Sequence, residues 1–223
     1  MNRLFNQDNP VMKALSKLFD IGWLSILYLV FCVPIVTIGP ATTALYYTAI
    51  KVLRRERGYV WSEFWGCFKR EFKYGAILGI GFTLIYVLLM FNLKYVGGGK
   101  SSYGGYLYGI YLAMLIVVTM VLSYTFPVLS RLALKPLKVL RLALYMSIRH
   151  LQFTIIHLAI LAVAVVGAWY SLILGLPILL LVIPGGLALV YTFPMEYILK
   201  KYQPKEEDIV TEDGEVIKAW YNE

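Results

Sequence analysis

Three titratable side chains lie in or beside apolar stretches, where a charge is costly enough to suggest function. They are Asp20, His157 and Glu196. A buried carboxylate or imidazole in a membrane can pass protons or hold a cation. Each group also has a simpler interpretation. Asp20 follows Lys17 by three residues and can pair with it on a helix. Glu196 precedes Lys200 by four residues, the favourable order for a helical pair, and His157 can bond a neighbouring helix.

The remaining sequence offers little for catalysis. No acidic residue occurs between Phe72 and Met195, so no carboxylate there can couple solute movement to protons or sodium. The two histidines and two cysteines lack metal-ligand spacing. The Gly-Gly-Gly-Lys run at 97–100 lacks the spacing of a phosphate-binding loop, and no serine stands in a G-x-S-x-G elbow. We therefore expect no enzyme activity, no metal and no cofactor.

The most unusual segment runs from 34 to 47, where two prolines and a glycine must break a helix. Its threonines can satisfy the freed backbone groups, and its small residues allow close helix packing. One interpretation is a break that lines a solute or partner site, as in transporters with discontinuous helices. The other is a tight hairpin packed by small residues. The candidate binding or partner-packing residues are Thr37, Gly39, Pro40, Thr42, Thr43, Tyr46 and Tyr47, with Asp20, His157, Tyr124, Tyr191 and Glu196 as secondary candidates.

The elements that must position these residues are membrane helices. The chain of 223 residues is 60% hydrophobic and 15% charged, whereas soluble domains carry about 25% charged residues. Lipid-exposed backbone must satisfy its own hydrogen bonds, which favours helices, and no alternating barrel pattern occurs. We expect an all-α integral membrane protein with about six transmembrane helices, the second either a full span or re-entrant. The apolar runs are 21–36, 38–50, 74–93, 106–130, 153–174 and 176–199.

The basic residues predict an orientation. With six spans and both termini in the cytoplasm, all of the 21 lysines and arginines except Lys94 and Lys100 fall on the cytoplasmic side. This bias explains the net charge of +8 without nucleic acid as a partner. We expect one polytopic membrane domain at 1–202 and a polar, mobile cytoplasmic tail at 203–223.

The spans group into three helical hairpins that resemble one another. Their returning helices end in similar sequences, and Tyr-Thr-Phe-Pro occurs at 124–127 and 191–194. A basic, amphipathic segment precedes each hairpin, at 11–20, 62–75 and 137–153. Each is expected to form an interfacial helix that contacts anionic lipid headgroups. One interpretation is a pseudo-threefold repeat. The other is that aromatic and basic residues simply mark helix ends at the cytoplasmic interface.

The first 75 residues contain a recognisable signature, which is Pro34, Thr37, Ile38, Gly39, Ala41, Thr42, Ala44, Tyr46 and Tyr47. A Phe- and Lys-rich connector follows at 64–72. With these features the segment resembles the YesL family of bacterial membrane proteins, a domain of unknown function. The resemblance implies a bacterial cytoplasmic-membrane protein, often encoded near carbohydrate ABC transporters, and brings no catalytic residues.

Two functions follow as hypotheses. The first is a non-enzymatic accessory or regulatory component of oligosaccharide ABC-type uptake, which would bind the permease subunits of the transporter. The second is a small-solute transporter or channel in its own right, because tyrosine rings can stack on sugars and threonines can bond hydroxyl groups. The missing ion-coupling carboxylates count against the second hypothesis.

Overall fold

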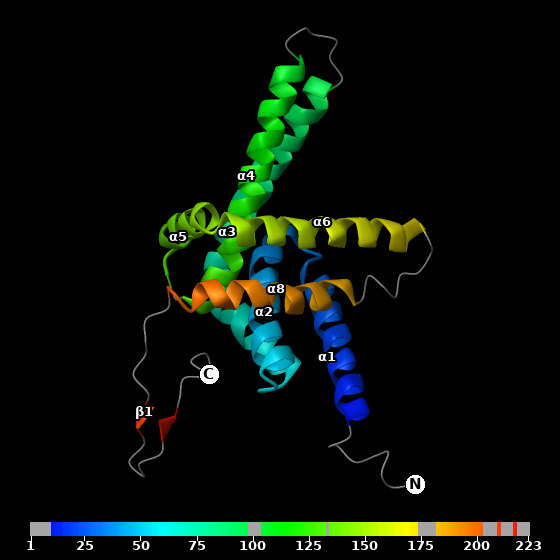
Figure 1. The fold of residues 1–223 in the computed structure, drawn as a ribbon, viewed down its shortest axis with the longest axis vertical. Helices are drawn as coiled ribbons and strands as arrows, with labels where there is room; N and C mark the ends of the chain where they lie inside the picture. The colour runs from blue at the N-terminus through cyan, green and yellow to red at the C-terminus, as the bar shows by residue number, and fades with distance from the viewer. Residues whose placement is uncertain are drawn as a thin grey trace.

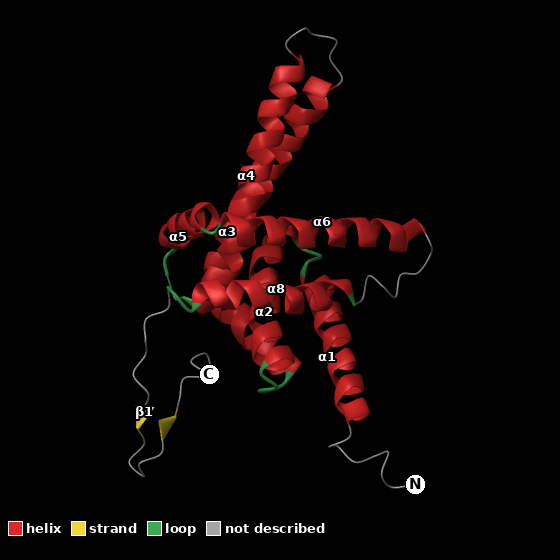
Figure 2. Cartoon of the chain, viewed as in Figure 1, coloured by secondary structure: helices red, strands yellow, loops and turns green. Residues whose placement is uncertain are grey.

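The computed structural model describes residues 10–97, 104–132, 134–173, 182–202, 209–210 and 216–217. The described chain is helical apart from one short pair of strands in the tail (Figure 2). The rest of the predicted tail lies outside the described residues. The elements are α1 (Pro10–Phe31), the 3-10 helix η1 (Ile35–Thr37), α2 (Ile38–Thr48), the π-helix η2 (Ala49–Arg54), α3 (Val60–Gly97), α4 (Gly104–Arg131), α5 (Pro136–Arg149), α6 (Leu151–Ile173), α8 (Ile183–Leu199) and the antiparallel strands β1 (Ile209–Val210) and β2 (Val216–Ile217).

Four described helices are long and apolar enough to cross a membrane. They lie in α1, α3, α4 and α6. Their outward faces carry large apolar side chains such as Phe91 and Val163, each 71% exposed. The other two expected spans are shorter where they are described. Residues 38–50 form α2 and the start of η2, and residues 183–199 form α8. The count of six spans therefore stays a prediction.

The helices do not form one parallel bundle. Figure 1 shows α3 and α4 as a long hairpin whose far end extends beyond the other helices. Helices α6 and α8 contact each other and run across this hairpin (Figure 1). The pseudo-threefold repeat stays a prediction.

Two of the three predicted interfacial segments are not separate helices. Residues 11–20 are the first part of α1, and residues 62–75 are the first part of α3. No proline or glycine pair interrupts either junction, so the helix runs on into the apolar sequence. The third segment does form its own helix, α5, which starts with Pro136 in its first turn and ends before His150. Proline suits this position because its missing N–H would have no partner there.

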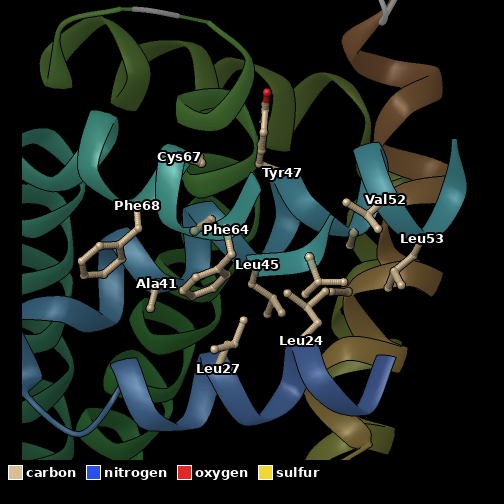
Figure 3. Close-up of a cluster of buried hydrophobic side chains, with 14 of the residues drawn as sticks. Leu24, Leu27, Ala41, Leu45, Tyr47, Val52, Leu53, Phe64, Cys67 and Phe68 are labelled. Atoms are coloured by element: carbon tan, nitrogen blue, oxygen red, sulfur yellow. The ribbon is translucent and has the colours of Figure 1, made fainter. Parts of the chain in front are cut away.

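The first hydrophobic core packs α1, α2 and the beginning of α3 around buried side chains (Figure 3). Leu24 and Phe64 are fully buried there. Phe31 closes one side, with its ring centroid 4.9 Å from that of Phe68. The second core joins α2, α4, α5 and α8 around Tyr124, Met146 and other buried residues. Helices α2, α3 and α8 contribute to both cores and so join them.

Candidate functional site

The broken segment at 34–47 serves helix packing. Gly39 and Pro40 of α2 face Gly75 and Gly79 of α3, which form a G-x-x-x-G pair. A Cβ atom on Gly75 would lie 2.9 Å from the Cα atom of Pro40. Only glycine fits so close an approach of two backbones. These contacts favour the hairpin packed by small residues over a site at Gly39.

The threonines of this segment bond the backbone, as their types predict. The Oγ1 of Thr37 donates to the carbonyl of Pro34 at 2.6 Å. The Oγ1 of Thr43 donates to Gly39 at 2.9 Å and is buried. Tyr47 also lies inside, where its ring meets the cationic groups of Lys51 and Arg70 at 5.6 and 5.1 Å. These three candidates stabilise the fold, and none of them lines the cavity between α2, α4, α6 and α8.

A cavity of about 590 Å³ lies between α2, α4, α6 and α8. It brings together four sequence-predicted candidates from three of these helices. Tyr28 of α1 and Tyr86 of α3 add to its polar groups, and mostly apolar side chains of α2, α4, α6 and α8 form the rest of the wall. The four candidates are Thr42, Tyr46, His157 and Tyr191.

Several hydroxyl groups of this wall pair with one another. The Oη of Tyr28 lies 3.5 Å from the Oγ1 of Thr42. On the α3–α4 side, the Oη of Tyr86 lies 2.5 Å from the Oγ1 of Thr119. Hydroxyl pairs of this kind can open to accept a third oxygen, because each hydroxyl has one donor and two acceptor positions.

Tyr191 repairs a break in α4. Pro127 lies inside α4 and has no N–H, so the carbonyl of Ser123, four residues earlier, lacks its helical donor. The Oη of Tyr191 donates to that carbonyl at 2.6 Å. The two Tyr-Thr-Phe-Pro segments thus meet at this point, since Tyr191 opens one and Pro127 closes the other. This contact ties α8 to α4 beside the cavity.

Two side chains of the cavity wall hold buried polar atoms without a partner. Neither ring nitrogen of His157 has a hydrogen-bond partner among the described residues, and the same holds for the Oη of Tyr46. The His157 ring stacks on Tyr191 at 4.0 Å between centroids and meets the edge of Tyr124 at 5.3 Å. Tyr124 itself lies behind the wall, bonded to Thr154 at 3.0 Å. A buried polar atom without a partner costs free energy, so this end of the cavity is incomplete.

A buried ion-pair cluster lies below the cavity. Glu196 is 3% exposed and its carboxylate pairs with guanidinium groups from two other elements. Arg55, which follows η2, lies 3.4 Å away, and Arg131 at the end of α4 also bonds it. Arg54 adds a bond of 3.0 Å to the carbonyl of Thr192. Ion pairs and a charged hydrogen bond therefore connect the η2 segment after α2 with the ends of α4 and α8.

The π-helix η2 aims two of these arginines. In it the N–H of Arg55 donates to the carbonyl of Ile50, five residues earlier, at 3.1 Å. An α-helix would use the residue four positions earlier. The wider turn places Arg54 toward Thr192 and Arg55 toward Glu196. Turns of this kind are rare in proteins, and those that occur are frequently found at functional sites.

Glu196 and Lys17 also bond residues that local spacing did not predict. Glu196 pairs across the fold, as described above, and Lys17 pairs with Glu56 at 3.2 Å. Asp20 lines a separate small pocket of about 210 Å³ with Lys13 and Lys17. Within the described residues, no group of three His, Cys, Asp or Glu side chains could hold a metal ion.

Sequence reasoning missed Tyr28, Tyr86, Arg55 and Arg131. A signal for the arginines was present, since Arg54 and Arg131 each lie seven residues after the tyrosine of a matching Tyr-Thr pair. Tyr28 and Tyr86 lie in apolar runs that gave no reason to prefer them over other tyrosines.

Comparison with known proteins gives one match. Residues 21–93 match the family model DUF624, described as a protein of unknown function. The match covers the second half of α1, all of α2 and most of α3, which include the glycine contacts and most of the first core. No curated protein and no solved structure matches the chain. The matched part does not include α4, α6 and α8, which supply most of the cavity wall.

Proposed function

We propose that this chain is a non-enzymatic, multi-pass protein of the bacterial cytoplasmic membrane that binds a small solute and acts as its transporter or channel. The cavity between the helices carries this proposal. Its volume of about 590 Å³ lies in the range of small-molecule sites. A mostly apolar wall with a few convergent hydroxyl groups is the usual composition of such sites.

The ion-pair cluster supports a transport role. On α4 and α8 the cluster residues Arg131 and Glu196 each follow a cavity-lining residue, Phe126 or Tyr191, by five positions. Five residues correspond to roughly 7.5 Å along a helix. The cluster therefore lies at one end of the cavity, the end with the basic residues assigned to the cytoplasm. Ion pairs there would have to separate before a solute could leave on that side.

The topology we propose has six spans with both termini in the cytoplasm. The distribution of lysine and arginine supports it. Helix α5 fits the cytoplasmic headgroup layer, because its exposed side combines Leu137 and Ile148 with Lys138 and Arg141. Anionic lipid headgroups are thus the proposed partners of α5.

A second candidate function is that of an accessory component of carbohydrate ABC-type uptake. The resemblance of the first 75 residues to the YesL family, together with the DUF624 match at 21–93, supports it. In this role the chain would bind the permease subunits of a transporter. Co-purification of the chain from its native membrane in mild detergent tests the idea, and recovery without any permease subunit would count against it.

Solute flux into proteoliposomes tests the leading proposal. Vesicles with the chain are loaded with a panel of radiolabelled neutral sugars and amphiphiles, and efflux is compared with empty vesicles. Ala164→Trp fills the cavity from α6, whereas Val163→Trp places the same ring on the exposed face one residue earlier. We expect faster efflux with the wild-type chain and with Val163→Trp, and none with Ala164→Trp. Efflux equal to that of empty vesicles for every solute would reject transport.

A further inference from the structure

The wall of the cavity changes from polar to apolar along α6 and α8. These helices pack against each other, and His157 of α6 stacks on Tyr191 of α8 at one end. Toward the other end α6 contributes Ala164 and Ala168, and α8 contributes Ile183. All described lining residues of α6 and α8 beyond the stacked pair are aliphatic or proline. The two ends therefore suit different chemical groups.

The polar end offers hydrogen bonds without charge. Tyr46 and Ser123 line it beside the stacked pair. None of the described lining residues is Lys, Arg, Asp or Glu. The nearest charges, Glu196 with Arg55 and Arg131, bond one another beyond the lining, so an ionised headgroup placed here would lose its hydration without an ion-pair partner on the cavity wall, which is unfavourable. A hydroxyl group that reaches His157 or Tyr46 would supply a partner that their buried atoms lack within the described chain.

The apolar end fits an aliphatic chain better than a sugar ring with its hydroxyl groups. From His157 to Ala168 is eleven residues, roughly 16 Å along a helix. A sugar that filled this length would set hydroxyl groups against the alanine, leucine and isoleucine of α6 and α8, which costs free energy for each group without a partner. On the facing wall, among the described residues, only the hydroxyl pairs of Tyr28 with Thr42 and of Tyr86 with Thr119, already bonded to each other, could serve such groups. An aliphatic chain would bury its surface against the same side chains at a gain. The cavity is also partly open, so a chain can enter from the side.

We infer that the ligand is a neutral, single-chain amphiphile with a hydroxylated headgroup. This inference rests on the proposed function and names its solute class. The headgroup lies at the end formed by Tyr46, His157 and Tyr191, and the aliphatic tail lies between α6 and α8. Free sugars and amphiphiles with an ionised head bind poorly.

Photo-crosslinking tests the inference. The protein in lipid nanodiscs is exposed to a dodecyl glucoside that carries a diazirine in its tail, and the labelled peptides are identified by mass spectrometry. We expect labelling on the lining residues of α6 and α8, reduced about tenfold by excess unlabelled dodecyl glucoside. Excess glucose or dodecyl sulfate should leave the labelling unchanged.

Two tryptophan variants separate the cavity from the lipid-facing surface. Ala164→Trp should lose about nine-tenths of the labelling, in line with a tenfold weaker interaction, and Val163→Trp should keep it. Should Ala164→Trp fail to fold, Ala164→Leu narrows the same wall by a smaller volume and serves in its place. Labelling spread over all exposed apolar faces, and equal in wild type and both variants, would overturn the inference.

The competitors distinguish failure of the solute class from failure of the proposed function. If glucose or dodecyl sulfate displaces the probe from the lining residues, the cavity binds a solute but the neutral amphiphile is the wrong class. If no probe labels the lining residues and no solute changes the efflux from proteoliposomes, both the inference and the proposed function are wrong.

Discussion

The ion-pair cluster and the cavity lie a few residues apart on the same helices, yet they satisfy their polar groups in different ways. In the cluster, Glu196 bonds guanidinium groups of Arg55 and Arg131. In the cavity wall, His157 and Tyr46 hold polar atoms with no partner among the described residues. A paired buried charge fixes helices in place, whereas an unpaired buried polar group leaves a site that a ligand can complete. The ion-pair cluster therefore holds one end of these helices rigid, whereas the cavity at the other end can adapt to a ligand.

Removing the carboxylate of the cluster should have the largest effect. Glu196→Ala leaves two buried guanidinium groups without their carboxylate and should lower the free energy of unfolding by about 3–5 kcal/mol. Denaturant titration in mild detergent measures this change. Glu56→Ala is the matched control, because the Glu56 side chain is 73% exposed and pairs with the partly exposed Lys17. That control should lose about 1 kcal/mol or less. Equal losses in the free energy of unfolding for the two variants would show that the buried cluster stabilises the fold no more than an exposed ion pair.

The glycine contact between α2 and α3 should rank second. Gly75→Ala places a Cβ atom 2.9 Å from the backbone of Pro40, and such overpacking should cost about 1–3 kcal/mol. Gly66 lies on the same helix, and its Cβ position meets no atom within 4 Å. Gly66→Ala should therefore stabilise the protein by up to about 1 kcal/mol through helix propensity. A gain in stability for both variants would show that the two helices do not pack as described.

The bond across the cavity should contribute less. Tyr191→Phe removes the donor to the carbonyl of Ser123 and should cost about 0.6 kcal/mol, the usual size for such a bond between membrane helices. Tyr197→Phe on the exposed side of α8 is the control and should change little. The thermal midpoint of unfolding in detergent compares the two. Identical midpoints would mean that Tyr191 does not repair the break at Pro127.

The unpartnered histidine should have the smallest effect. His157→Phe keeps an aromatic ring against Tyr191 and removes two buried nitrogens that have no partner in the described part of the chain, so the free energy of unfolding should stay within about 0.5 kcal/mol or rise. The same substitution should weaken cross-linking of the amphiphile, because the headgroup loses a hydrogen-bond partner. A large loss of stability would instead show that His157 is paired, and the cavity would then resemble the cluster.

Long apolar runs could be located from the sequence. The runs at 106–130 and 153–174 agree with α4 and α6 within a few residues. They could be assigned to helices because each run is too long for a β-strand of a soluble protein and is apolar on all sides. The start of α3 was placed too late, because the basic segment before the apolar run continues the same helix. The close contact of Gly39 with Gly75 could not be predicted, because it depends on how two helices pack, although the small residues at 39–44 indicated that some helix approaches closely.

The candidate site was predicted in part. Thr42, Tyr46, His157 and Tyr191 all line the cavity, but nothing in their spacing showed that they meet. The partners of Glu196 were missed because local spacing favoured Lys200, four residues away, over Arg55 at a distance of 141 residues. Local pairs can be read from helical periodicity, whereas contacts between distant segments depend on how the helices cross.

The π-helix at Ala49–Arg54 determines how this segment responds to the insertion or deletion of one residue. Its wider turn takes up one residue more than an α-helical turn, so Arg54 and Arg55 keep their aim at Thr192 and Glu196. One inserted codon here would carry both arginines about 100° around the helix axis. One deleted codon would let the segment wind as an ordinary α-helix with both arginines in place. We therefore expect this segment to tolerate the loss of a residue but not the gain of one.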